Sequence, residues 1–337
     1  MPTDSDMLFL VAISACALLA TLVLAKFWIR VARKIGLEGK DMNKADKRLV
    51  PEAGGIAFIA GFSLAVMAFI FSITFVFKGD GNLLEIFAAL TAMLLAGFIG
   101  FTDDILGWKI GLRKWQKPLL TIPIAIPLAV INAGDSFMEL PFLGNTNLGI
   151  LYPLLAIPIG IVGAANGFNM LAGYNGLEAA LGIVIISALG YKAYATGFVW
   201  LAILAFAAAG ALLGFLFYNR YPARVFPGDT LTYSVGAFIA VLAILGNMQK
   251  IAIILFLPFF AELLLKMRSR FRAENFGTPA KDGGLGMPQG KVSSVTHIIL
   301  KLFPRLFGRN AKEYEVVGVL VIAELVLVTL AMFVVQS

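Results

Sequence analysis

Long apolar stretches separated by short polar segments make up most of this chain. Ten of them can be counted, at residues 7–29, 55–77, 84–102, 115–133, 149–165, 177–195, 198–218, 231–247, 250–267 and 314–335. A helix needs about 20 mostly apolar residues to cross the hydrocarbon core of a bilayer, and it satisfies its backbone hydrogen bonds internally. The pattern therefore predicts an all-α polytopic integral membrane protein, with about ten transmembrane helices in a single domain spanning residues 1–337.

Composition supports the same interpretation. Hydrophobic residues make up 60% of the 337 residues and charged residues 14%, whereas a soluble protein of this length must cover its surface with more polar groups. The first apolar stretch is too long for the core of a secretory signal peptide and follows no basic segment, so we expect it to remain as a helix. Cys16 is the one cysteine of the chain, which excludes an intrachain disulfide.

The Lys and Arg residues are distributed unevenly between the two sets of loops. Of the 27, 24 lie in or beside the segments that follow the odd-numbered stretches, and the other three are Lys78, Lys192 and Lys250. Because basic loops stay in the cytoplasm, we expect both termini outside and five cytoplasmic loops, at 30–54, 103–116, 166–176, 219–230 and 268–313. The net charge of +7 then reflects topology, and we expect no nucleic-acid partner.

Adjacent carboxylates, Asp103 and Asp104, close the third apolar stretch in the segment Gly-Phe-Thr-Asp-Asp-Ile-Leu-Gly. Charges at a membrane boundary are costly unless something positive compensates them. A divalent cation or the proton chemistry of a substrate would do so. A solvated helix end is the alternative, and this segment alone leaves both interpretations open.

The segment 165–178 joins the fifth and sixth stretches without a Lys or Arg, and it holds three asparagines, Asn166, Asn169 and Asn175. Amide oxygens are suitable ligands for Mg²⁺ and also hydrogen-bond bases and hydroxyls. The glycines of the segment let the backbone approach a ligand closely. A tight turn with helix caps would have the same composition, so a binding site and a turn both remain open.

Two further segments carry candidate chemistry. Asp229 and Thr230 could cap the eighth helix, or Asp229 could present a carboxylate to a metal while Arg224 meets phosphate. The loop after the ninth stretch carries the only histidine, His297, and three arginines at alternate positions from residue 268. Such basic clusters usually set topology or contact anionic lipid, and phosphate binding is the alternative.

The predicted topology brings all four polar segments to one face of the membrane, although hydrophobic spacing alone did not require this. Carboxylates and amides suited to a metal, with arginines beside them, are typical of a site for a substrate that contains pyrophosphate. The active site is therefore expected at the cytoplasmic helix ends and loops.

The polar segments also resemble the motifs of a known family. Asn-Gly-Phe-Asn-Met-Leu-Ala-Gly-Tyr-Asn-Gly-Leu-Glu-Ala, from Asn166, resembles the signature loop of the polyprenyl-phosphate N-acetylhexosamine-1-phosphate transferases. Arg-Val-Phe-Pro-Gly-Asp-Thr, from Arg224, is similar to a motif of the eukaryotic and archaeal branch, the dolichyl-phosphate N-acetylglucosamine-phosphotransferases. Segments from Arg48 and Phe101 resemble two more motifs, and the likeness runs in order from about residue 45 to 250.

The resemblance implies a role for each matching position. Asn169 and Asp229 would bind Mg²⁺, with Mn²⁺ as the alternative metal. Three residues would be catalytic, namely Asp103, Asp104 and Lys117, and the resemblance leaves open whether Asp103 is a base or only positions substrate. The substrate-binding residues would be Glu52, Asn166, Asn175 and Phe226 at the uridine end, and Arg270 and Arg272 at the pyrophosphate. The segment around these arginines departs from the family's histidine-containing motifs, which leaves the sugar open; His297 is interpreted as structural.

The reaction implied is transfer of N-acetylhexosamine-1-phosphate, with N-acetylglucosamine as the first choice of sugar. The donor would be a UDP-sugar, the acceptor a polyprenyl or dolichyl phosphate, and the membrane the plasma membrane of an archaeon. One alternative is the same reaction with another UDP-sugar. The other is a non-catalytic lipid or solute transporter, which would need charged groups deep in the spans, where only Glu262 and Glu324 stand. The sequence is compatible with a homodimer but does not define an oligomeric state.

Overall fold

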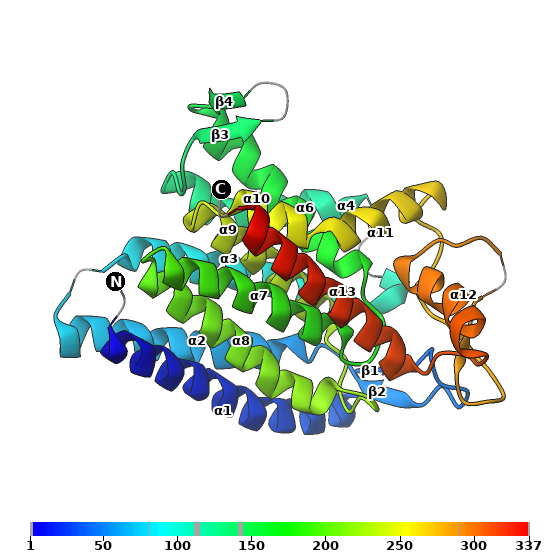
Figure 1. Cartoon of the computed structure of the whole chain (residues 1–337). Helices are drawn as coiled ribbons and strands as arrows, with labels where there is room; N and C mark the ends of the chain where they lie inside the picture. Colours follow the sequence, from blue (N-terminus) through cyan, green and yellow to red (C-terminus); the bar gives the residue numbers. More distant parts are fainter. Residues whose placement is uncertain (1–2, 80, 111–114, 141–143, 289, 336–337) are drawn as a thin grey trace.

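The protein is a bundle of helices that run roughly along one long dimension (Figure 1). The structure, a computed structural model, describes residues 3–79, 81–110, 115–140, 144–288 and 290–335. Residues 111–114 of the predicted loop 103–116 and residue 289 of the predicted loop 268–313 lie outside this description. The prediction of an all-α polytopic membrane protein is confirmed.

Within the described residues, eight helical runs are long and apolar enough to cross a membrane. They comprise α1 (Asp4–Ile35), α2 (Gly55–Phe71) with the π-helical turn Ser72–Phe77, α3 (Leu83–Ile110), α6 (Ile157–Met170) after the π-helical turn Tyr152–Ala156, α7 (Leu177–Ala195), α8 (Val199–Asn219), α9 (Gly228–Leu245) and α13 (Glu313–Val334). Each matches one of the predicted stretches.

The other two predicted stretches are helical but broken. The fourth contains α4 (Gln116–Thr121), a 3₁₀ turn (Ile122–Ala125) and α5 (Ile126–Val130), and the ninth contains α10 (Gln249–Leu255) and α11 (Leu257–Arg268). Pro123, Pro127 and Pro258 lie at the start of the segments that follow the breaks, where they remove a backbone donor and clash with the preceding turn. The predicted count of ten therefore corresponds to eight long helices and two interrupted ones.

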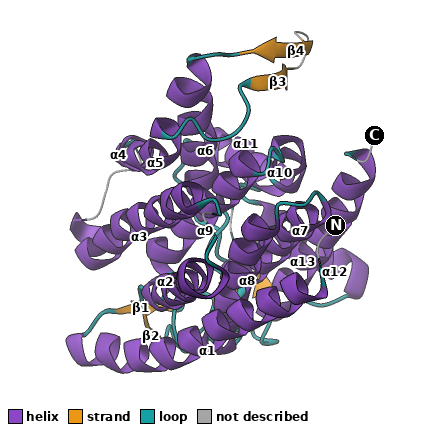
Figure 2. Cartoon of the chain, turned by 90° about the vertical axis from the view of Figure 1, so that its left-hand side faces the viewer, coloured by secondary structure: helices purple, strands orange, loops and turns teal. Residues whose placement is uncertain are grey.

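Among the described residues, three small antiparallel hairpins and one amphipathic helix complete the fold. The strands pair as β1 (Glu38–Lys40) with β2 (Leu49–Pro51), β3 (Phe137–Leu140) with β4 (Gly144–Asn147), and β5 (Thr278–Pro279) with β6 (Leu285–Gly286). The helix α12 (Val295–Phe307) and the β1–β2 hairpin both lie at one end of the bundle, here called the site end (Figure 1). The β3–β4 hairpin stands out at the opposite part, here called the far end (Figures 1 and 2).

Helix α9 forms the centre of the bundle and packs against α3, α6, α2 and α7. Almost all of its side chains are buried, and Figure 2 shows it enclosed by the other helices. Gly100 of α3 allows the closest approach, because a Cβ there would lie 2.3 Å from the carbonyl oxygen of Asp229. The N-terminus of α9 is thus held tightly against α3 at the site end.

The loops expected to share one face do meet at the site end. The side-chain nitrogen Nδ2 of Asn43 donates to the Gly173 carbonyl at 3.0 Å, and Gly277 N donates to Asn43 Oδ1 at 3.0 Å. Asn175 N donates to Glu313 Oε1 at 2.8 Å, which ties the α6–α7 loop to the start of α13. These bonds bring the predicted loops 30–54, 166–176 and 268–313 together at one end of the bundle, and their cytoplasmic placement stays a prediction.

Candidate active site

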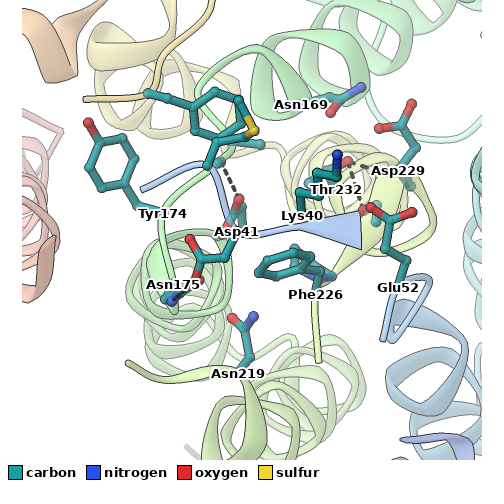
Figure 3. Close-up of a pocket in the computed structure, with 17 residues that line it drawn as sticks. Lys40, Asp41, Glu52, Asn169, Tyr174, Asn175, Asn219, Phe226, Asp229 and Thr232 are labelled. Atoms are coloured by element: carbon teal, nitrogen blue, oxygen red, sulfur yellow. Dashed lines mark hydrogen bonds between the residues drawn. The ribbon is translucent and has the colours of Figure 1, made fainter. Parts of the chain in front are cut away.

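A cavity of about 290 Å³ lies at the site end, among the loops that converge there (Figure 3). It is lined by Lys40, Asp41, Met42, Glu52, Asn169, Ala172, Gly173, Tyr174, Asn175, Glu178, Asn219, Phe226, Pro227, Gly228, Asp229, Thr232 and Phe276. Five of these were predicted as site residues from the sequence, namely Glu52, Asn169, Asn175, Phe226 and Asp229. Five residues that the sequence singled out from three separate segments therefore line one cavity, and their roles stay predictions.

A lysine bridges two carboxylates at the edge of this cavity. Lys117 Nζ, from α4, lies 2.7 Å from Asp103 Oδ2 of α3 and 2.6 Å from Asp229 Oδ2 of α9. Charge-assisted contacts of this length are strong where water is partly excluded. Two predicted catalytic residues and a predicted metal ligand thus form one ionic cluster, from three helices.

Asp104 is at the site, but both of its oxygens face the start of α9. Oδ1 accepts from Asp229 N at 2.7 Å, while Oδ2 accepts from Thr230 N at 3.1 Å and from Thr230 Oγ1 at 2.5 Å. A carboxylate at a helix N-terminus satisfies free N–H groups and the positive end of the helix dipole. Gly228 leaves the room for it, because its φ is +68° and a Cβ would lie 2.1 Å from Asp104 Oδ2. Asp104 therefore positions Asp229 through the backbone.

Asn169 and Asp229 lie near each other on one wall of the cavity (Figure 3). Their oxygens suit Mg²⁺, which proteins usually hold through one or two carboxylates while substrate phosphates and water complete the shell. The Lys117 ammonium already lies between Asp103 and Asp229, which shows that these carboxylates converge on a positive charge. No group of three or more His, Cys, Asp or Glu among the described residues is arranged to hold a metal by itself. The residues thus fit a metal completed by phosphate oxygens, and the metal stays a prediction.

The residues predicted for the uridine end are held in place by other segments. Asn175 Nδ2 donates to Asp41 Oδ2 at 3.1 Å, and Phe226 N donates to the Pro51 carbonyl at 2.7 Å. Glu52 lies on the other side of the Phe226 ring in Figure 3, and burial, followed by the negative charge of Asp229, raises the pKa of its carboxyl group. The ring of Phe226 therefore sits between an amide and a carboxyl group.

Two buried polar side chains that sequence reasoning missed, Glu178 and Asn219, line the same cavity. Glu178 Oε1 accepts from Gly173 N at 2.6 Å, and Asn219 Nδ2 donates to the Val225 carbonyl at 2.9 Å. The other carboxylate oxygen of Glu178, Oε2, and the side-chain oxygen of Asn219, Oδ1, have no hydrogen-bond partner among the described residues. Buried polar atoms are rarely left unpaired, because this costs about 1–3 kcal/mol each. These two line the cavity, which is where a ligand could pair with them.

Asn166 does not line the cavity. Its side chain is buried and donates to Thr121 Oγ1 at 2.9 Å and to the Val162 carbonyl at 2.9 Å. Thr121 is on α4, one turn after Lys117, so the bond joins the helix of the lysine to the helix of Asn169. Asn166 supports the site from behind.

Arg270 and Arg272 are exposed and do not line the cavity. After α11, Arg270 and Phe271 adopt φ values of +52° and +57°, and this left-handed turn redirects the chain. The loop reaches the site through later residues instead, since Phe276 lines the cavity. Asn275 Nδ2 donates to the carbonyls of Met170 and Ala172 at 2.7 and 2.8 Å. The expected contact of the two arginines with pyrophosphate stays a prediction.

His297 is buried in α12, and its Nδ1 accepts from Ser293 N at 3.4 Å. Burial lowers its pKa, as expected for a neutral imidazole inside a protein. It does not line the cavity, in agreement with its interpretation as structural.

Comparison with known proteins identifies the family. Residues 86–247 match the model of glycosyl transferase family 4. A protein of Saccharolobus solfataricus is 38% identical over 87% of this chain and 86% of its own length. A protein of Sulfolobus acidocaldarius is 35% identical over 88% and 87%. Both carry the assigned name UDP-N-acetylglucosamine–dolichyl-phosphate N-acetylglucosaminephosphotransferase.

The likeness extends to bacterial proteins. A phospho-N-acetylmuramoyl-pentapeptide-transferase of Shouchella clausii is 34% identical over 64% of this chain and 66% of its own length. The resemblance seen in the sequence motifs is thereby confirmed over most of the chain. On this evidence the chain belongs to the polyprenyl-phosphate N-acetylhexosamine-1-phosphate transferases of glycosyl transferase family 4.

Proposed function

We propose that this protein transfers N-acetylglucosamine-1-phosphate from UDP-N-acetylglucosamine to a polyprenyl phosphate of the dolichyl type and releases UMP. The observation that carries the proposal is the Lys117 bridge between Asp103 and Asp229. It places a fixed positive charge beside a cavity at the ends of apolar helices, where the phosphate of a membrane lipid would lie. The assigned names of the two archaeal relatives state the same donor and acceptor.

The nucleoside of the donor would occupy the wall that carries Asn175 and Phe226. The ring of Phe226 offers a face on which a base can stack. The unpaired oxygens of Glu178 and Asn219 favour a ligand that brings hydrogen-bond donors. Uracil N3–H and the ribose hydroxyls are such donors, so this wall suits a uridine nucleotide.

In the proposed step, an oxygen of the lipid phosphate forms a bond to the β-phosphorus of the donor. The bond from that phosphorus to the bridging oxygen breaks, and its electron pair leaves with UMP. A phosphate monoester has a second pKa near 6, so the attacking phosphate is largely ionised at neutral pH and needs no base. Asp103, paired with Lys117 at 2.7 Å, therefore serves to position the ammonium.

Lys117 would hold the phosphates of the two substrates in place and offset their negative charge. Positioning and charge stabilisation supply most of the acceleration in phosphoryl transfer. Asn169 and Asp229 would hold Mg²⁺, or Mn²⁺ in its place, which supplies charge neutralisation at the pyrophosphate oxygens when bound. Asp104 would keep Asp229 in register through the backbone of α9.

The site end is proposed to face the cytoplasm, with both termini on the other side of the plasma membrane. The support is the bias of basic residues along the sequence, since 24 of 27 lie in or beside the segments that follow the odd-numbered apolar stretches. Both ends of the described chain lie toward the far end (Figure 1), as this orientation requires.

The proposal is tested with purified protein in detergent, mixed with UDP-N-acetylglucosamine, polyprenyl phosphate and Mg²⁺, with an EDTA control. We expect metal-dependent UMP release together with a lipid-linked sugar pyrophosphate. UMP release only with a different UDP-hexosamine would keep the reaction and correct the sugar. A folded protein that releases no UMP from any donor would overturn the enzymatic function and favour a transporter.

A further inference from the structure

The side chain of Asn175 lies on the proposed nucleoside wall of the active-site cavity, beside Asp41 of the segment that joins β1 and β2 (Figure 3). We infer that Asp41 fixes the orientation of the Asn175 amide and thereby selects uracil over cytosine in the donor nucleotide. The inference deepens the proposed function and rests on it, because it takes this wall as the place of the base. Asp41 acts through Asn175, so it is a positioning residue.

The first observation is the hydrogen bond between the two side chains. Asn175 Nδ2 donates to Asp41 Oδ2 at 3.1 Å, and both residues are buried. An ionised carboxylate only accepts hydrogen bonds, whereas the two ends of an amide differ, since the N–H₂ group donates and the oxygen accepts. The bond therefore assigns the amide. A flipped amide would place two acceptor oxygens against each other in a buried position, which is costly.

The second observation is that Asp41 is held in place by its own neighbours. Its Oδ1 accepts from Asn43 N at 3.2 Å, and Lys44 Nζ lies 3.7 Å from its Oδ2. Lys44 also bonds to Glu313, whose Oε1 accepts from Asn175 N at 2.8 Å. The main chain and the side chain of Asn175 are thus both anchored, to two carboxylates that share one ammonium group.

The third observation concerns the other end of the amide. Within the part of the chain that the structure describes, Asn175 Oδ1 has no hydrogen-bond partner. It is also not fully enclosed, in contrast to the unpaired oxygens of Glu178 and Asn219. Because Asn175 lines the cavity, this oxygen is the end of the amide that is open to a ligand. The wall therefore offers a hydrogen-bond acceptor at a fixed position.

An acceptor at this position distinguishes the two pyrimidine bases. Uracil carries a hydrogen-bond donor at N3, whereas N3 of cytosine is itself an acceptor. A site built to pair with one group rejects an analogue that lacks it, because the polar atom of the site is then left unpaired. A residue at position 41 that can donate as well as accept would allow the Asn175 amide to flip, and the choice between the bases would be lost.

The test measures the binding of UDP and of CDP, with Mg²⁺, to the full-length protein in detergent by isothermal titration calorimetry. The wild type is expected to bind UDP about tenfold more tightly than CDP, the worth of one hydrogen bond. Asp41→Asn should bring the two dissociation constants close together, because its amide can donate or accept. Asp46→Asn is the matched control, since Asp46 lies in the same segment and its exposed carboxylate pairs with Arg48, and it should keep the full preference.

Asp41→Glu keeps a carboxylate and should keep the preference for UDP, even if both nucleotides bind more weakly. If Asp41→Asn does not fold, Asp41→Ser takes its place, since a hydroxyl also donates or accepts. Equal binding of UDP and CDP by the wild type, an unchanged preference in Asp41→Asn or Asp41→Ser, or a lost preference in either Asp41→Glu or Asp46→Asn would overturn the inference. Binding does not require turnover, so a wild type that prefers UDP but releases no UMP would overturn the proposed reaction alone.

Discussion

The two ends of the bundle use their polar residues in different ways. At the site end, hydrogen bonds join segments far apart in the sequence, as between Asn43 and Gly173, which are 130 positions apart, and between Asn175 and Glu313, which are 138 apart. At the far end most side-chain hydrogen bonds are local, as from Thr196 Oγ1 to the Lys192 carbonyl four residues earlier. The comparison teaches that the fold concentrates its long-range polar contacts where side chains must keep a fixed geometry.

The largest effect is expected where the ionic cluster loses a carboxylate. Asp229→Asn keeps the shape but removes the charge that faces Lys117, so we expect UMP release in single turnover to fall about a thousandfold. Asp46→Asn is the control, because Asp46 is an exposed carboxylate at the same end, and its activity should match the wild type. Near-normal activity of a folded Asp229→Asn protein would break the assignment of the site end as the catalytic end.

A smaller loss is expected for Asp104→Asn, which leaves Asp229 in place but weakens the backbone contacts that hold it. Changes to groups that orient a metal ligand typically cost about 10- to 100-fold in metal affinity or activity. We expect a loss in that range, with the Mg²⁺ concentration for half-maximal activity shifted upward. Asp282→Asn, at an exposed turn where the carboxylate also accepts backbone N–H groups, should change neither quantity. An unchanged Mg²⁺ dependence in Asp104→Asn would contradict the positioning role.

The unpaired oxygen of Glu178 gives a test of nucleoside recognition. Glu178→Gln replaces it with an N–H₂ group while Gly173 N can still donate to the remaining oxygen. The KM for the UDP-sugar should rise about tenfold, the worth of one hydrogen bond, while kcat stays close to that of the wild type. An equal loss in kcat with no change in KM would show that Glu178 acts on the reacting phosphates instead.

The smallest effect concerns Glu52. Burial, followed by the negative charge of Asp229, raises the pKa of this carboxyl group. The folded state then binds the proton more tightly than the unfolded chain, so the stability contributed by this group is lost as pH rises from its ordinary pKa through the raised one. Glu52→Gln does not titrate. The difference in Tm between the variant and the wild type should therefore shift by about 2 °C in favour of the variant over that pH window. A Tm difference that does not change with pH would show that folding does not raise the pKa of Glu52.

The comparison also explains how far sequence reasoning could go. The spans were predictable because crossing a bilayer requires a run of about 20 apolar residues. The grouping of their loops was predictable because Lys and Arg are concentrated in alternate loops. The motif positions led to Asp103, Lys117 and Asp229, which do meet. What the sequence could not show is contact between distant segments, such as Asn275 with the α6–α7 loop. The left-handed turn at Arg270 and Phe271 has no signal in the residue pattern either.

Some of the missed features did leave a trace in the sequence. Asn219 is the last residue of the apolar helix α8. A polar residue at that position is expected to mark the end of the helix, but Asn219 is buried and lines the cavity. The prolines of the fourth and ninth stretches signalled breaks, but the total length of each stretch still suggested one continuous helix. In both cases a local pattern was compatible with two structures, and tertiary packing selected one.

The lysine between the two carboxylates has a consequence for how the protein is assembled. Lys117 is an internal counter-ion, so its single positive charge offsets part of the negative charge of Asp103 and Asp229 before any substrate or metal arrives. Sites whose ligands lack such a partner gain part of their folding energy from the metal and unfold when it is removed. This chain can complete its fold in the membrane without that help. Chelation is thus expected to silence the enzyme while leaving it folded, with the melting temperature lowered only by the few degrees that loss of a bound ligand brings.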